Sequence, residues 1–120
     1  MLPLTKNNVD ICLFKCSHES LSSEIIRSPE QYIALGELKG GIDPAGADEH
    51  WKTAHSAIER IKRAFKKSKL NPKTFFVASA IEKNMANEIW KLLSDGELDN
   101  AANLTDDQQL DCIARWICSL

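Results

Sequence analysis

The sequence predicts a single α/β domain, in which a small mixed sheet is flanked by helices in the order β-β-α-β-α-α. Three observations support this prediction. Short apolar, β-rich runs alternate with longer segments whose apolar residues recur every three or four positions. Glycine, proline and asparagine separate these runs. The length of 120 residues fits one domain around one core.

Three short segments are predicted as strands. Residues 9–14 (VDICLF) follow the turn-prone Asn7-Asn8, and residues 32–39 (YIALGELK) end at Gly40-Gly41. Residues 74–78 (TFFVA) are β-rich and too few for a helix. Between the first two strands we expect a loop with a helical turn. The glycine- and proline-rich segment after the second strand is expected to be a loop of special backbone shape up to residue 47.

The first predicted helix spans residues 48–67. Asp48 and Glu49 would lie in its first turn, where acids complement the helix dipole. Asn71-Pro72 would end the segment. Its apolar stripe consists of Trp51, Ala54, Ile58, Ile61 and Phe65.

Two further helices are predicted from capping boxes. Ser79 with Glu82 would start the second helix, which runs to Gly96, and Thr105 with Gln108 would start the third. Each has an apolar side that can face a core. These sides consist of Ile81, Met85, Ile89 and Leu92 in the second helix, and of Leu110, Ile113, Trp116 and Ile117 in the third.

The composition excludes several other classes of protein. Apolar residues make up 43% and charged residues 27% of the chain, and no run of about 18 apolar residues could cross a membrane. The N-terminus has no charged start followed by an apolar core, so no signal peptide is predicted. The cysteines lack zinc-site spacing, so we expect small buried thiols and a cytoplasmic protein. They are Cys12, Cys16, Cys112 and Cys118.

The net charge of −2, from 15 basic and 17 acidic residues, conceals an uneven distribution. Seven basic residues and no acid lie between positions 60 and 73, whereas six acids and no base lie between 95 and 111. The basic stretch is either a solvated helix end, where cations suit the dipole, or a stripe that contacts phosphates. On the second interpretation the DNA contacts are Arg60, Lys62, Arg63 and Lys66.

A candidate catalytic cluster lies around the second predicted strand. Glu37 and Lys39 are two residues apart, so their side chains share one face, beside a glycine-rich loop. Asp10 in the first strand could supply a second carboxylate. Two acids can hold a divalent metal, and a lysine can polarise a nucleophilic water. A cross-strand salt bridge is the alternative for Glu-x-Lys, but charges in apolar strands are costly without a purpose.

These residues resemble a known family. The pattern Asp10…Glu37-x-Lys39 is similar to the core of PD-(D/E)xK nucleases. The string GELKGGIDPAGADEHWKTA, residues 36–54, resembles the catalytic segment of the AvaI/BsoBI family of type II restriction endonucleases. NVDICLF and the ending from Thr74 to Trp116 are similar to the same family.

The resemblance implies a restriction-endonuclease-like core that uses Mg²⁺. It also implies a homodimer that cuts double-stranded DNA at a palindrome of the CYCGRG type. Asp10 and Glu37 would take the metal positions, and Lys39 a catalytic one. Family members carry a helical region before this core, and Met1 stands only nine residues before Asp10. We therefore expect residues 1–120 to be the catalytic part alone.

Two further residues are candidates for this site. His50 falls where the family carries an additional active-site histidine. A neutral imidazole there could orient or deprotonate the attacking water, although a capping histidine at a helix start is the alternative. The helix N-terminus would favour the neutral form and the adjacent acids the protonated form. Asp43 could accept a hydrogen bond from a cytosine amino group, or form a turn before Pro44.

Two other functions remain open. The chain could be an inactive remnant that serves as a DNA-binding or interaction module, which would show salt-sensitive binding without cutting. It could also be a repair-type nuclease of the same fold, which would prefer branched or damaged DNA to a fixed palindrome.

Overall fold

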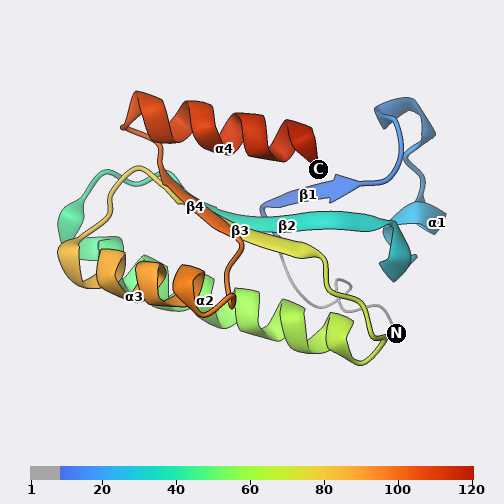
Figure 1. Ribbon diagram of the computed structural model, residues 1–120, viewed down its shortest axis with the longest axis horizontal. Coiled ribbons are helices and arrows are strands. Elements are labelled where there is room, and N and C mark those ends of the chain that lie inside the picture. The colour runs from blue at the N-terminus through green and yellow to red at the C-terminus, as the bar shows by residue number, and fades with distance from the viewer. Residues whose placement is uncertain (1–8) are drawn as a thin grey trace.

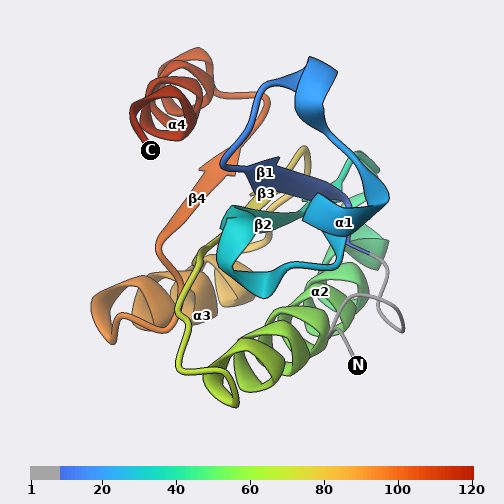
Figure 2. The ribbon, with the colours of Figure 1, turned by 90° about the vertical axis from the view of Figure 1, so that its right-hand side faces the viewer.

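The computed structural model describes residues 9–120 as a four-stranded mixed sheet between two layers of helices (Figure 1). Helix α4 covers one face of the sheet, and α2 and α3 cover the other, as the view in Figure 2 also shows. The elements in chain order are β1 (Ile11–Phe14), α1 (Ser23–Ile26), β2 (Tyr32–Lys39), α2 (Pro44–Lys66), β3 (Lys73–Ala78), α3 (Lys83–Ser94), β4 (Asn100–Asn103) and α4 (Asp107–Ser119).

The strands are ordered β1-β2-β3-β4 in space. β1 pairs antiparallel with β2, with Ile11 opposite Gly36. β2 pairs parallel with β3, where Glu37 lies beside Phe76, and β3 pairs parallel with β4. The expected α/β class with a small mixed sheet is confirmed.

The alternating side chains of β2 divide between the two helical layers. Leu35 packs with Ile61 and Phe65 of α2, whereas Ala34 packs with Phe75 and with α4. Because successive side chains of a strand point to opposite faces, the odd-numbered residues of β2 from Leu35 onward face α2. The next two odd positions are those of the predicted catalytic cluster.

Gly36 is required by packing in the centre of β2. A Cβ at this position would lie 2.3 Å from the ring of Phe75, so no larger residue fits without displacing that ring. Phe75 in turn meets Trp116 of α4 edge-to-face, with ring centroids 5.8 Å apart. The missing side chain at Gly36 thus lets an aromatic ring bridge the sheet and α4.

Helix α2 confirms the predicted apolar stripe but begins four residues earlier than expected. The five stripe residues are all buried. The helix starts at Pro44, since proline suits the first helical position, where its missing N–H costs nothing. The expectation that Asp48 and Glu49 lie in the first turn is therefore wrong, because the first turn contains no acid.

Both predicted capping boxes are wrong in detail. The N-cap of α3 is Glu82 rather than Ser79, and its side chain makes no capping hydrogen bond. The N-cap of α4 is Asp106, whose carboxylate accepts two backbone N–H groups of the first turn. Thr105 instead donates its hydroxyl to Asn103. An aspartate one residue further on provides the stronger cap.

The sequence-based order omits the edge strand β4. Its residues, NAAN, are of types depleted in strands, so no strand was expected there. Pairing with β3 makes it a strand, with Phe75 beside Asn100 and Ala78 beside Asn103. The predicted loop before β2 does contain a helical turn, α1.

Other expectations have mixed outcomes. All four cysteines are free thiols, but none is fully buried as expected: Cys12 and Cys16 are half-buried, and Cys112 and Cys118 on α4 are exposed. Leu110 of α4 is 43% exposed instead of facing the core. Two predictions concern the first eight residues, namely the lack of a signal peptide and the turn at Asn7-Asn8. Both fall outside the described residues. No helix within residues 9–120 has the length and apolar character to span a bilayer.

Candidate active site

The structure brings Asp10 and Glu37 together. Asp10 lies directly before β1, and the antiparallel register places it next to Glu37 on β2. Its Oδ2 accepts a hydrogen bond of 2.8 Å from the backbone N–H of Leu38. This bond orients the Asp10 side chain across the two strands. Asp10 itself is exposed, so the acid pair opens to solvent at one side.

Glu37 is buried, with only 4% of its surface exposed. Its Oε1 has no hydrogen-bond partner among residues 9–120. Burial raises the pKa of Glu37 to about 7, and the hydrogen bond and negative charge of Asp10 contribute to the rise. A buried carboxylate oxygen without a partner costs about 1–3 kcal/mol or more, so the fold maintains this group at the expense of stability.

Two cations lie near the acid pair. The charges of Lys39 and then Arg60 lower the pKa of Glu37, opposing the effects of burial and Asp10. Lys39 follows Glu37 on the same face of β2 and is half-buried, whereas Arg60 reaches the site from α2 and is exposed. The site therefore combines two acids and two cations from three elements that are distant in sequence.

The residues fit a divalent metal of the Mg²⁺ type. No group of three or more His, Cys, Asp and Glu side chains within residues 9–120 could enclose a metal ion. Mg²⁺ is commonly held by one or two carboxylates, with waters and substrate phosphates completing its octahedron. Asp10 and the unpartnered oxygen of Glu37 supply that number, and hard oxygen ligands suit such an ion.

His50 lies beside the glycine loop that follows β2. A Cβ on Gly41 would be 3.8 Å from His50 Cε1, and one on Gly46 would be 3.9 Å away. The imidazole therefore packs against this loop, close in sequence to the end of β2 at Lys39. His50 is exposed and lies in the second turn of α2, so its predicted position at the helix N-terminus is wrong.

A part-buried hydrogen bond ties the N-terminal half of α2 to α3. The indole Nε1 of Trp51 donates to Glu88 Oε2 of α3 at 2.6 Å, and the Trp51 ring contacts Phe76 edge-to-face. Because Trp51 follows His50 directly, this bond also holds the helix turn that presents the imidazole. The stripe pattern predicts a buried Trp51 that needs a partner for its N–H. The sequence does not reveal that Glu88 is this partner.

Cys12 is a neighbour of Glu37 that the motif Asp10…Glu37-x-Lys39 does not include. Burial raises the pKa of its thiol, and the negative charge of Glu37 raises it further. Cys12 lies on β1, opposite Leu35, and packs on the side of the sheet that faces α2. The strand alternation that places Glu37 toward α2 could have identified this neighbour.

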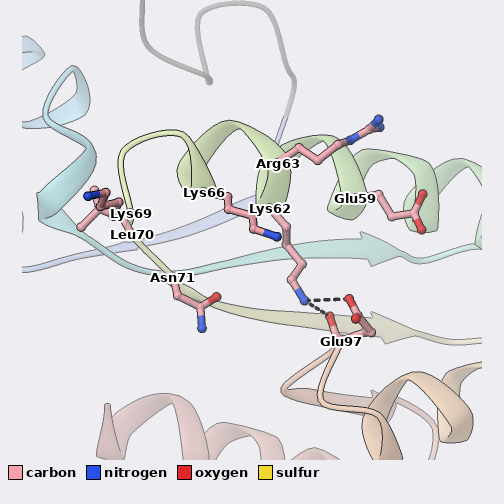
Figure 3. Close-up of a pocket in the computed structure, with 8 residues that line it drawn as sticks. All are labelled: Glu59, Lys62, Arg63, Lys66, Lys69, Leu70, Asn71 and Glu97. Atoms are coloured by element: carbon pink, nitrogen blue, oxygen red, sulfur yellow. Dashed lines mark hydrogen bonds and ion pairs between the residues drawn. The ribbon is translucent and has the colours of Figure 1, made fainter.

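The predicted DNA contacts divide into three groups. Asp43 is exposed directly before α2, beside the loop that carries Gly41. Arg60 belongs to the acid site. The remaining three, Lys62, Arg63 and Lys66, line a groove of about 680 Å³ along the C-terminal half of α2 (Figure 3).

Lys62 has a structural partner within that groove. Its Nζ donates to the backbone oxygen of Glu97 and lies 3.4 Å from Glu97 Oε2. Figure 3 shows Lys62 pointing across to Glu97, while Arg63 extends away from it. Lys62 therefore ties α2 to the segment before β4.

A mixed sheet covered by helices on both faces is compatible with the restriction-endonuclease-like class of folds. Asp10, Glu37 and Lys39, which the sequence resemblance predicts for the site, lie near the end of its antiparallel strand pair. The family model of restriction endonuclease BsobI matches residues 1–120, so the chain belongs to this family of restriction endonucleases.

Similar proteins extend this finding. The chain is 57% identical over 119 residues to the type II restriction enzyme AvaI of Nostoc sp. (strain PCC 7120), covering 99% of this chain and 38% of that protein. It is 53% identical over 120 residues to the type II restriction enzyme BsoBI of Geobacillus stearothermophilus, covering 99% of this chain and 37% of that protein. The chain therefore spans less than two fifths of the length of these relatives.

Proposed function

We propose that this chain is the catalytic part of a type II restriction endonuclease, which hydrolyses phosphodiester bonds of double-stranded DNA with Mg²⁺. The observation that carries the proposal is the buried carboxylate of Glu37, which has an unpartnered oxygen beside Asp10 and shares its face with Lys39. A structural salt bridge would have paired that oxygen. A site for a cation leaves it free.

The residues have separate roles in this proposal. Asp10 and Glu37 hold Mg²⁺, which when bound supplies positive charge to the phosphate and makes water more acidic. Lys39 stabilises the negative charge that develops on the phosphate oxygens as the water oxygen attacks phosphorus and the opposite P–O bond breaks. His50 orients the water or accepts its proton from the side of the glycine loop.

The proposed substrate is supported by the family resemblance of residues 36–54, which include the loop before α2. We propose a CYCGRG-like palindrome read by a homodimer in the cytoplasm, with Asp43 accepting a hydrogen bond from a cytosine amino group in the major groove. The phosphate contacts in this proposal are Arg60, Arg63 and Lys66, because Lys62 is already paired with Glu97.

Cleavage of supercoiled plasmid with and without Mg²⁺ tests the proposed chemistry. Asp10→Asn, Glu37→Gln and Lys39→Met should each slow cutting by roughly 10²–10³-fold or more, while exposed Lys91→Met on α3 serves as the control. Equal rates for the site variants and the control would contradict the proposed site. Duplexes with and without CYCGRG, together with a branched duplex, separate restriction-type from repair-type cleavage.

One observation favours a second function, that of a DNA-binding module without activity. The groove on α2 is rich in cations, whether or not the acid site is active. This function predicts salt-sensitive DNA binding by the wild type with no Mg²⁺-dependent cutting in the plasmid assay.

A further inference from the structure

The groove along α2 contains cations that have no acidic partner among residues 9–120. Four basic residues and two acids line it, a net charge of +2. Both acids already have partners: Glu97 pairs with Lys62, and Glu59 lies 3.3 Å from His55 Nε2. Within residues 9–120, Arg63, Lys66 and Lys69 have no acidic partner. The groove-lining residues are Glu59, Lys62, Arg63, Lys66, Lys69, Leu70, Asn71 and Glu97.

Lys69 holds a backbone conformation that favours glycine. Its φ is 58°, the one positive φ of a residue other than glycine within residues 9–120. The N–H of Leu70 bonds to the carbonyl of Phe65 at 3.1 Å, and that of Lys69 to Lys66 at 3.0 Å. This is the Schellman pattern that ends many helices, in which the left-handed residue is usually glycine. Leu70 also packs against the cluster that contains Phe65, a contact that often accompanies this pattern.

The helix dipole explains the presence of only some of the basic residues at the C-terminal end of α2. Cations near a helix C-terminus are favourable, which explains Lys66 and its neighbour Lys67 on stability alone. Lys69 costs stability at a position where glycine would be better, and it adds repulsion between like charges. Figure 3 shows Lys69 at the helix end and Asn71 below it, on the segment that leads into β3. Because Lys69 lowers the stability of this helix end, its presence suggests that it binds an anion from outside the protein.

The position of the groove fits a DNA strand that also reaches the acid pair. Arg60, whose charge acts on Glu37, lies one turn before Arg63. From Arg60 to Lys66 the helix rises by about 9 Å, at ~1.5 Å per residue. Arg60 and Arg63 thus connect the acid pair to the groove along one helix.

We infer that this groove is a separate phosphate-binding site, in which Lys66, Lys69 and Asn71 hold the DNA backbone beside the stretch that reaches the acid pair. Lys62 supports the wall of the groove through its hydrogen bond to the backbone oxygen of Glu97. It does not itself contact a phosphate. The site adds affinity that does not depend on Mg²⁺. This inference rests on the proposed function for its ligand.

The test measures DNA binding by the full chain without cleavage. Fluorescence anisotropy of a labelled 30-bp duplex in EDTA gives Kd at several salt concentrations. Lys66→Gln/Lys69→Gln should lower the slope of log Kd against log salt by about 1.8, or ~0.9 for each lost phosphate contact. The matched pair Lys67→Gln/Lys83→Gln removes the same charge from exposed positions outside the groove and should change the slope by less than half as much.

Lys69→Gly separates binding from folding. This variant should raise the Tm by roughly 3 °C, because glycine suits the left-handed position, and should still lower the salt slope by about 0.9. A higher Tm with an unchanged slope would show that Lys69 serves the helix end alone. That result would overturn the inference.

Two other outcomes would also overturn it. Equal loss of slope in the two charge-matched pairs would indicate diffuse attraction with no defined site. Inorganic phosphate binding that depends on Lys66 and Lys69, with unchanged duplex binding, would indicate a site for small anions. Repeating the series in Glu37→Gln keeps the two proposals distinguishable. A chain that binds through the groove but never cuts contradicts only the proposed function, and one that cuts with an unchanged slope contradicts only the groove.

Discussion

The β4 side and the β1–β2 side of the sheet, at its two opposite edges, differ in whether their polar groups have hydrogen-bond partners. At the β4 edge, the N–H groups of Ala101 and Asn103 donate to Asn100 Oδ1 and Gln109 Oε1, each at 2.8 Å, so side chains satisfy the donors of this edge. On the β1–β2 side, Glu37 is buried with an oxygen that has no partner within residues 9–120. Buried polar groups are nearly always paired.

The paired groups at the β4 edge stabilise the fold, whereas the unpaired carboxylate on the β1–β2 side suits a functional site. An edge strand with capped N–H groups is protected from pairing with another chain and gains stability from each cap. A buried carboxylate beside another carboxylate costs stability, and it is useful where a cation will bind. The comparison therefore predicts that substitutions on the two sides change stability in opposite directions, and that only the β1–β2 side responds to metal.

The largest expected effect is on Glu37. Its pKa of about 7 in the folded protein lies above the ordinary value of 4.5, so the stability due to its protonated form is complete below pH 4.5 and is lost as the pH rises through 7. Glu37→Gln mimics the protonated form at every pH. Its free energy of unfolding should lie within about 1 kcal/mol of that of the wild type at pH 5 and exceed it by about 3 kcal/mol at pH 8.

Urea denaturation followed by circular dichroism from pH 5 to 8 measures this difference. Exposed Glu49→Gln on α2 is the control and should follow the wild type throughout. A constant difference between Glu37→Gln and the wild type across this range would show that the carboxyl of Glu37 does not titrate there.

The next effect concerns metal binding. At Mg²⁺ equal to ten times its Kd, the wild type should gain roughly 1.4 kcal/mol of stability, because the ion binds the folded state. Glu37→Gln and Asp10→Asn should gain almost none, and the gain of the wild type should fall below pH 7 as Glu37 becomes protonated. Thermal unfolding over a Mg²⁺ titration measures these gains. An equal gain in all three proteins would place the ion elsewhere.

Sequence reasoning worked best where side-chain pattern and backbone agree. The bounds of β2 follow from its apolar run and the glycines after it, and the buried stripe of α2 follows from its helical spacing. It failed for β4, because asparagine and alanine become a strand only through pairing with β3. The early start of α2 at Pro44 was missed although proline at a helix start is a local signal.

The site was only partly predictable for a similar reason. Alternation along β2 and the antiparallel neighbour strand bring Asp10, Glu37 and Lys39 to one place. The burial of Glu37 depends on how α2 covers the sheet, which no short motif contains. The pairing of Lys62 with Glu97 likewise depends on contact between segments 35 residues apart. Pattern therefore predicts which residues share a face, and packing decides which of them have partners.

On the β4 side, Gln109→Ala should cost about 1 kcal/mol of unfolding free energy, since the N–H of Asn103 loses its acceptor. Gln108→Ala is the matched control, because it makes the same change one residue earlier on an exposed position of α4. Urea denaturation measures both, and the stabilisation by Mg²⁺ should be the same in both variants. A loss of Mg²⁺ response in Gln109→Ala would contradict the separation of the two sides.

The smallest expected effect tests whether an unpaired oxygen alone marks a functional site. Thr74 on β3 is buried, and its Oγ1 also has no partner within residues 9–120. Its backbone is satisfied, because its N–H donates to Asp99 Oδ2 at 2.8 Å and its carbonyl accepts from the N–H of Asp99. Thr74→Val should therefore raise stability by about 0.5 kcal/mol at every pH, with no change in Mg²⁺ response or cleavage.

Glu37 and Thr74 differ in charge and in neighbours rather than in burial. The Glu37 carboxylate has Asp10, Lys39 and Arg60 around it, and its cost varies with pH, whereas the cost of a neutral hydroxyl does not. Denaturation of Thr74→Val at pH 5 and pH 8 compares the two residues directly. A destabilisation of more than ~1 kcal/mol would mean that the hydroxyl has a partner such as an ordered water. An unpaired oxygen in this sheet would then not by itself mark a functional site, and only its charged neighbours would distinguish Glu37 from Thr74.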